Sequence, residues 1–318
     1  AYVLLHHYMG EVDGNVGAWG YARGGMGSIT KAMSKSLIAN GGNIRAGSAV
    51  KNILVKNNRS YGLALENDDE IYADKIVSNL DVKRTFLKVV EKKELPSEFY
   101  TAVKNFKIRG SSGKLNIALD DKPIWKSIPK DDPASTGDLH FTQSIAEMEG
   151  AYDDWKDGKW SSLPYVDMCI PTLNDPTMAP QGKQYMSVFV QYVPYNLADG
   201  GWTEEKRIQF GDHVMKRIAN YSTNFKDIIL HAEVRTPKEL ESEVGLTEGN
   251  IFQGELTMDQ LMFNRPIPGY AQYKSPIKNL YMCGSSTHPG GGVMGAPGAN
   301  AARVILNDLG KKIRSHYL

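Results

Sequence analysis

The sequence has little cysteine and no pattern of metal ligands. Its two cysteines, Cys169 and Cys283, lie far apart and form no Cys-x-x-Cys pair, which argues against a thioredoxin-like dithiol and against a zinc cluster. The adjacent His6 and His7 would point to opposite sides of an extended strand. Because no Asp/Glu/His set completes a site with them, we expect no metal and take a reducing compartment as the default.

The sequence also lacks an excess of charge of one sign and a long apolar run. Its 37 Lys and Arg side chains balance 36 Asp and Glu side chains, and no long basic cluster marks a nucleic-acid surface. We therefore expect no nucleic-acid partner. No apolar run approaches the roughly 20 residues that cross a bilayer, although short stretches such as residues 186–190 could contact a membrane peripherally.

The first residues lack an initiator methionine. Residues 1–7 read Ala-Tyr-Val-Leu-Leu-His-His, without the basic region or the cleavage-site pattern of a signal peptide. We therefore expect the chain to begin inside a longer protein. With 318 residues, of which 41% are hydrophobic, the chain can bury the cores of about two domains.

Glycines and apolar spacing predict the order of the elements. A glycine-rich turn at 24–27 precedes a helical pattern that ends at Gly41-Gly42, and strand-like runs follow at 49–55, 61–65 and 70–78. The middle of the chain mixes strands and helices, and loops rich in Gly, Pro or Ser separate them. The predicted strands there are 114–119 and 184–192, the helices 204–221 and 256–264, and the loops 131–137 and 153–162.

The densest glycine run lies near the end of the chain. Residues 284–296 read Gly-Ser-Ser-Thr-His-Pro-Gly-Gly-Gly-Val-Met-Gly-Ala, between a predicted strand at 280–283 and a predicted helix at 300–309. Glycine allows positive φ and a close approach of backbone to ligand, while the N–H groups and dipole of the following helix favour an anion such as a pyrophosphate. The alternative is a tight strand-to-helix turn without a ligand. The glycine density exceeds what a turn needs and favours the ligand.

These residues resemble the C-terminal FAD motif of the phytoene-desaturase-like superfamily of FAD-dependent oxidoreductases. The resemblance rests on residues 279–284 and 287–296, and it covers nearly the whole chain through 24–27, 77–79, 169–171, 191–195, 249–252 and 259–261. It implies an α/β plus α+β fold: the C-terminal part of a two-domain, glutathione-reductase-like flavoprotein. The implied parts are FAD-binding at 21–80 and 277–312, a substrate domain of mixed sheet and helices at 81–276, a linker or substrate-domain segment at 1–20, and a tail at 313–318.

The resemblance also implies which residues contact FAD. Gly284 and Ser285 would lie beside the ribityl-pyrophosphate, and the backbone around Val293, Met294 and Gly295 would face the pyrimidine edge of the flavin ring. Many relatives carry an acidic residue where this chain has Ser285. The contact to the ribityl chain would therefore be uncharged.

Three further cofactor-binding residues are predicted, and one part of the family pattern is missing. Gly291 and Gly292 would admit the close approach of the cofactor, and Val50 matches the strand residue that holds adenine through its main chain, with a plain core valine as the alternative. An N-terminal Gly-x-Gly-x-x-Gly fingerprint, whose helix carries the dinucleotide pyrophosphate, is missing, because 24–27 lacks its spacing and the strand before it. The resemblance therefore implies the flavin-ring half of an FAD site, with the adenine-pyrophosphate half upstream of Ala1.

Candidate catalytic and substrate-binding residues follow from side-chain chemistry. His288 could polarise the flavin or handle a proton near neutral pH, or it could order the loop by hydrogen bonding. Arg265 could line a pocket or anchor a carboxylate, or pair with Asp259 at the surface. Tyr192 and Phe263 could wall an apolar substrate channel, for which core packing is the alternative. We predict His288 as catalytic and Tyr192, Phe263 and Arg265 as substrate-binding.

The predicted function is the FAD-dependent oxidation, desaturation or isomerisation of a small hydrophobic organic substrate, with FAD accepting a hydride equivalent. A carotenoid or phytoene-type polyene is the alternative substrate. A non-catalytic interaction scaffold that keeps the flavoprotein fold is the alternative class. The resemblance implies a cytoplasmic location for a bacterial protein and the mitochondrial matrix for a eukaryotic one.

Overall fold

The computed structural model of the chain describes residues 11–12, 14–18, 20–129, 132–293 and 295–311. It contains two compact units: the first unit is Ala1–Ile44 with Ser111–Leu240, and the second unit is Arg45–Gly110 with Glu241–Leu318. These bounds differ from the predicted domains, since 21–44 lies in the first unit, and 81–110 and 241–276 lie in the second. The predicted tail at 313–318, and residues 1–10, 13 and 19 of the predicted segment at 1–20, lie outside the described residues.

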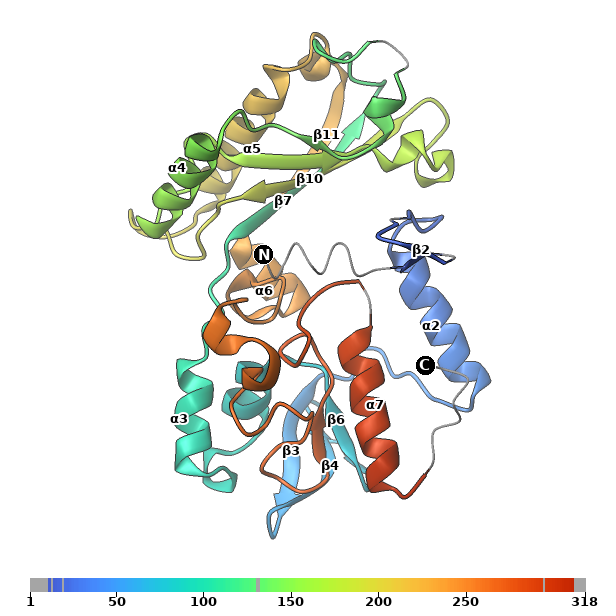
Figure 1. The fold of residues 1–318 in the computed structure, drawn as a ribbon, viewed down its shortest axis with the longest axis vertical. Helices are drawn as coiled ribbons and strands as arrows, with labels where there is room; N and C mark the ends of the chain where they lie inside the picture. The colour runs from blue at the N-terminus through green and yellow to red at the C-terminus, as the bar shows by residue number, and fades with distance from the viewer. Residues whose placement is uncertain (1–10, 13, 19, 130–131, 294, 312–318) are drawn as a thin grey trace. The chain divides into compact units, whose positions relative to one another are not determined.

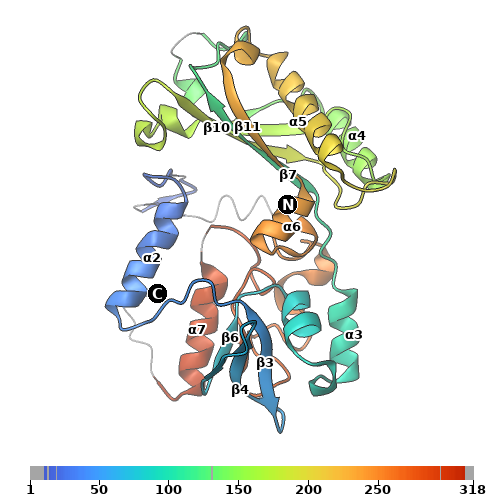
Figure 2. The same cartoon turned by 180° about the vertical axis from the view of Figure 1, so that it is seen from behind.

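A five-stranded antiparallel sheet forms the centre of the first unit, with strand order β11-β7-β10-β9-β8. Every second residue of β7 and β10 is buried, as expected when a strand turns one face to a core. Phe210, Val214 and Ile218 of α5 complete that core, and α5 lies along one face of the sheet (Figures 1 and 2). The strands are β7 (Ser112–Leu119), β8 (Leu139–His140), β9 (Tyr165–Cys169), β10 (Gln184–Gln191) and β11 (Ile229–Arg235).

Helix signals in the sequence explain the helices of the first unit. Thr203 caps α5 by accepting a hydrogen bond from Lys206 N, and Ser144 caps α4 by accepting one from Glu147 N, which satisfies main-chain donors at each helix start. The helices are α2 (Gly27–Ala39), α4 (Ile145–Lys156) and α5 (Glu204–Ala219), while α6 (Pro237–Val244) crosses into the second unit. A short hairpin pairs β1 (Glu11–Val12) with β2 (Asn15–Val16).

Two small sheets form the second unit. An antiparallel sheet has the order β3-β4-β5, and a parallel pair joins β6 to β12. The main apolar core includes Phe86, Phe99, Ile108 and Ile277. The strands are β3 (Val50–Lys56), β4 (Arg59–Leu65), β5 (Glu70–Tyr72), β6 (Ile76–Ser78) and β12 (Leu280–Met282), and the longer helices are the π-helix η1 (Arg84–Val89), α3 (Ser97–Asn105) and α7 (Ala296–Asp308).

Short 3-10 turns connect these elements. They are η2 (Lys92–Glu94), η3 (Pro133–Thr136), η4 (Pro171–Leu173), η5 (Pro176–Met178), η6 (Phe225–Ile228), η7 (Thr247–Gly249), η8 (Met258–Gln260) and η9 (Met262–Asn264). None of the described helices has the length and apolar character that crossing a bilayer would require.

Three predicted elements were wrong or displaced. The helix predicted at 256–264 is two separate turns, η8 and η9, because Met262 has a left-handed φ of 53° that a helix of L-residues does not accommodate. The loop predicted at 153–162 begins inside α4, which ends at Lys156. The last helix starts at Ala296 rather than at residue 300, since Pro297 lies in its first turn, where proline is tolerated.

Candidate functional site

The glycine run connects β12 to α7 in the second unit. All three residues of β12 are buried, and α7 lies beside this strand, with Tyr281 OH donating to Asp308 (2.8 Å) (Figures 1 and 2). Gly295 immediately precedes α7 with a left-handed φ of 65°, and Ala299 N donates to Gly295 O (3.0 Å) in the first turn. The predicted strand, glycine loop and helix are therefore present, and the loop leads to a helix N-terminus whose first N–H groups have no intrahelical acceptor.

The first part of the run, residues 284–291, is packed against the protein; we call it the packed half. A Cβ at Gly284 would lie 2.5 Å from Asn79 O, and a Cβ at Gly291 would lie 2.8 Å from Phe252 Cδ1. Real Cβ atoms do not approach other atoms this closely. Glycine is required at these two positions by packing within the chain, whether or not a ligand binds.

In residues 292–298 the described glycines are exposed, although Pro297 is buried; we call this segment, apart from Met294, the open half. Cβ atoms built at Gly295 and Gly298 would have no neighbour within 4 Å. Gly292 is exposed with a φ of 149°, and the side chain of Val293 is 75% exposed, while Met294 lies outside the described residues. Contacts within the described chain therefore do not require glycine at Gly295 or Gly298.

Arg265 holds the packed half in place. Its side chain is fully buried (0% exposed), and its guanidinium donates to Ser285 O (Nη2, 2.7 Å; Nε, 3.0 Å) and to Phe252 O (Nη2, 2.8 Å). It also donates to the carbonyls of Gly254, Glu255 and Gln260. Burial of a charged group is tolerated when its donors are satisfied in this way. The alternative of a surface pairing with Asp259 is wrong, because the Arg265 side chain is buried and Asp259 pairs instead with Lys107 (2.8 Å).

Hydroxyl groups fix the turn around Ser285. Ser286 Oγ donates to Gln253 O (2.6 Å) and accepts from Val82 N (3.0 Å), and Thr287 Oγ1 donates to Gly284 O (2.8 Å). Ser285 contributes its carbonyl to Arg265, so the main chain at the predicted ribityl contact is held from inside the protein. The turn is therefore preorganised by side chains of the protein itself.

His288 is half-buried within the packed half, and its main-chain carbonyl accepts a hydrogen bond from Tyr273 OH (2.8 Å). Its Nδ1 is buried and has no hydrogen-bond partner among the described residues. Burial, and then the charge of Arg265, lower the pKa of His288 below its ordinary value. The imidazole is therefore neutral near pH 7 and retains one ring nitrogen for a further partner.

Gln253 is a residue of this site that the sequence did not reveal. Its Oε1 is buried without a hydrogen-bond partner in the described part of the chain, and it would lie 2.9 Å from a Cβ at Gly284. The backbone of Gln253 has a left-handed φ of 52°. An unusual backbone is a property of the folded loop, and no motif at this position predicts it.

The remaining predicted site residues are spread over both units. Val50 is the half-buried first residue of β3, paired with Leu65, and Phe263 lies in η9 with its side chain 75% exposed. Tyr192 belongs to the first unit, where its ring contacts Tyr152 at a centroid distance of 5.3 Å. The structure brings Gly284, Ser285, His288 and Arg265 together, while Tyr192 is in a different unit from Phe263.

The first unit carries a polar sheet face that the sequence analysis also missed. Lys114 is half-buried on β7 and donates to Ser187 Oγ (2.7 Å), and Tyr185 OH donates to Asn116 Oδ1 (2.7 Å). Burial lowers the pKa of Lys114. The alternation of polar with buried apolar residues along β7 and β10 was the available signal.

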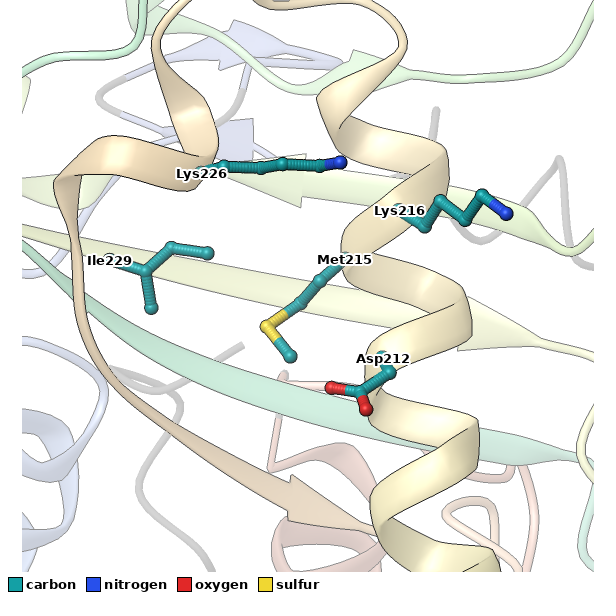
Figure 3. A pocket seen from close by; sticks show the side chains of 5 residues that line it. All are labelled: Asp212, Met215, Lys216, Lys226 and Ile229. Carbon is teal, nitrogen blue, oxygen red and sulfur yellow. The ribbon is translucent and has the colours of Figure 1, made fainter.

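A separate hollow of about 290 Å³ opens on the first unit, lined by Asp212, Met215, Lys216, Lys226 and Ile229. Figure 3 shows Lys226 extending toward α5, which carries Asp212, Met215 and Lys216. No predicted site residue lines it. Across the described residues, His, Cys, Asp and Glu form no group of three that could hold a metal ion.

The chain is similar to known proteins over nearly its whole length. The profile of the family described as flavin containing amine oxidoreductase matches residues 1–306. Pyridine nucleotide-disulfide oxidoreductase domain-containing protein 2 of Rattus norvegicus is 38% identical over 317 residues, covering 97% of this chain and 54% of that protein. This chain spans about half the length of the curated relatives it matches.

Two more distant relatives have named activities. One subunit of the limonene dehydrogenase of Castellaniella defragrans is 26% identical, covering 92% of this chain and 56% of that protein. Prolycopene isomerase of Daucus carota is 27% identical, covering 99% of this chain and 48% of that protein. These similarities confirm the resemblance to phytoene-desaturase-like flavoproteins.

A solved oxidoreductase from Methanosarcina mazei has a similar fold, with a TM-score of 0.55 and 20% identity, covering 90% of this chain and 55% of that one. This likeness confirms the predicted mixed α/β class. The match over residues 1–306, the relatives and the glycine loop lead to the same conclusion: the chain belongs to the flavin-containing amine oxidoreductase family.

Proposed function

We propose that the polypeptide containing this chain is an FAD-dependent oxidoreductase that oxidises, desaturates or isomerises an apolar, isoprenoid-like substrate. The observation that carries the cofactor assignment is the open half of the glycine run. Gly295 and Gly298 have no packing neighbour for a Cβ, yet they lie at the N-terminus of α7, where N–H groups and the helix dipole favour an anion.

Polar groups in the packed half and beside it, at Gln253, fit a flavin nucleotide. Gln253 Oε1 and His288 Nδ1 are buried without partners among the described residues, and flavin rings and ribityl chains carry both donors and acceptors. When bound, FAD would supply the acceptor of a hydride equivalent. Gly284, Ser285 and Gly291–Gly295 would contact it through main-chain atoms, and Val50 would contact adenine in the same way.

The protein would contribute positioning and proton handling. Arg265 fixes the carbonyl of Ser285, so the loop would need little reorganisation on binding. His288, neutral near pH 7 because burial and Arg265 lower its pKa, would be able to take up or orient a proton at its free ring nitrogen.

Exposed apolar side chains support a hydrophobic substrate. Met258, Met262 and Phe263 of η8 and η9 are 80%, 47% and 75% exposed, and Tyr192 belongs to an aromatic group with Tyr152 and Trp155 in the first unit. Apolar surface of this kind is typical of ligand-binding regions. The names of the limonene dehydrogenase and prolycopene isomerase relatives favour a terpene or, as the second candidate, a carotenoid-type polyene.

The test is the absorption spectrum of the natural polypeptide that contains this chain. We expect flavin bands in the purified protein or after incubation with FAD, and anaerobic bleaching of these bands by a terpene or a polyene. Absence of flavin bands after incubation would contradict the enzyme and favour the interaction scaffold. Bleaching by one substrate class and not the other would decide between them.

A further inference from the structure

Gln253 combines two energetic costs at one residue. Its φ of 52° lies in the left-handed region, which is unfavourable for a residue that carries a Cβ. Its buried Oε1 has no hydrogen-bond partner among the described residues, and an unsatisfied buried acceptor loses its hydration without compensation. Glycine would remove the first cost, and leucine would remove the second.

The loop around Gln253 is well held, so the strain is not a property of a loose segment. Gln253 N donates to Asn250 O (3.0 Å), and Gln253 O accepts from Ser286 Oγ (2.6 Å). On either side, Phe252 O and Gly254 O accept from the guanidinium of Arg265. Strained residues persist where their surroundings determine them, and they cluster at ligand sites.

The unsatisfied oxygen lies at the glycine loop. A Cβ at Gly284 would be 2.9 Å from Gln253 Oε1, so the carboxamide oxygen is adjacent to the predicted ribityl contact. A second buried atom without a partner among the described residues, His288 Nδ1, belongs to the same packed half. Two unsatisfied polar atoms at one loop are unusual in a native fold, and a shared ligand with hydrogen-bonding groups would satisfy both.

We infer that Gln253 is a ligand-binding residue of this site, whose carboxamide oxygen accepts a hydrogen bond from the flavin held by the glycine loop. The inference rests on the proposed function and adds a residue to it. Flavins offer hydroxyl donors on the ribityl chain and an N–H donor on the ring. The Gln253 carboxamide oxygen lies beside Gly284, on a left-handed backbone that hydrogen bonds of the surrounding loop hold in place.

The test compares Gln253→Leu with Gln272→Leu in the natural polypeptide. Gln272 is an exposed glutamine of the same unit and is the matched control. Flavin dissociation constants are measured for FAD and for riboflavin by quenching of flavin fluorescence, and the thermal stability of the flavin-free proteins is measured separately. Gln253→Met, which replaces the carboxamide oxygen by a weakly accepting thioether and is unbranched, repeats the test if the leucine variant fails to fold.

We expect Gln253→Leu to raise the flavin dissociation constant about three- to tenfold, the effect of one neutral hydrogen bond, and Gln272→Leu to leave it unchanged. Flavin-free Gln253→Leu should be as stable as the unmodified protein or more stable, because an unsatisfied acceptor is removed. Equal affinities in the two variants would overturn the inference and leave the flavin site standing, as would lost stability with unchanged affinity. Failure of the unmodified protein to bind any flavin would overturn the proposed function and the inference with it.

Discussion

The packed half and the open half of the glycine run use the same residue for different physical reasons. In the packed half, Gly284 and Gly291 leave no space for a Cβ because Asn79 and Phe252 lie against them. In the open half, a Cβ built at Gly295 or Gly298 would meet no atom within 4 Å. Glycine density alone therefore does not identify a ligand site, because packing within the chain accounts for part of it.

The difference assigns the two halves different tasks. The packed half is a rigid base, tied to residues 252–265 through the buried guanidinium of Arg265. The open half presents backbone and the N-terminus of α7. Positive φ values account for glycine at Gly292 and Gly295, whereas neither packing nor a positive φ requires glycine at Gly298. A ligand that approaches the backbone closely would explain Gly298, so the argument for FAD rests more on the open half than on Gly284.

The largest effect on folding is expected from Gly284→Ala. The new Cβ would lie 2.5 Å from the carbonyl oxygen of Asn79, and relief of this clash by backbone movement should cost about 1–3 kcal/mol of unfolding free energy. Urea unfolding measures the loss. The control is Gly298→Ala within α7, which meets no atom and should be neutral or up to about 1 kcal/mol more stable, since alanine favours helix. Equal stabilities for the two variants would remove the distinction between the halves.

The same distinction shows how much of this site the sequence could predict. Strand-like runs, the glycine stops and the strand before residue 284 predicted the positions of several elements, because these signals are local. From the sequence, Gly284 and Gly295 were both predicted to contact FAD. The sequence did not show that packing requires the first glycines of the run, because their neighbours Asn79 and Phe252 lie far from the run in sequence. That separation requires the fold.

Arg265 and Gln253 show a second limit. A lone arginine before proline predicts a charged surface or a pocket, and only the fold reveals five carbonyl acceptors around a fully buried guanidinium. Gln253 has no sequence signal, because its left-handed backbone and unsatisfied Oε1 depend on how residues 250–254 turn beneath the loop. Both environments depend on contacts between residues that lie far apart in the sequence.

A smaller effect, on flavin rather than on folding, is expected from Gly295→Ala. Gly295 and Gly310 precede and follow α7 with φ values of 65° and 66°, and neither has a neighbour within 4 Å of a built Cβ. Alanine at either position should cost about 1 kcal/mol of stability for its left-handed backbone. Only Gly295→Ala should also weaken flavin binding, by about tenfold for a lost ~1.4 kcal/mol, as measured by fluorescence titration. Equal flavin affinities for Gly295→Ala and Gly310→Ala would indicate that the open half is a turn that binds no flavin.

The smallest effect concerns the charge of His288 in the packed half. Its pKa is lowered from the ordinary value of 6.5 by burial and by Arg265, so the unfolded chain binds the proton more readily than the folded chain. Stability should be unaffected well above pH 6.5 and should fall as the pH drops below that value toward the lower folded pKa. His288→Gln should remove this part of the loss, so melting temperatures at about pH 7.5 and about pH 5.5 should differ less in the variant than in the unmodified protein. Every other residue is the same in both proteins, so the difference isolates His288. If both proteins lose the same amount, the packed half does not keep His288 neutral, and its role as a proton acceptor loses its physical basis.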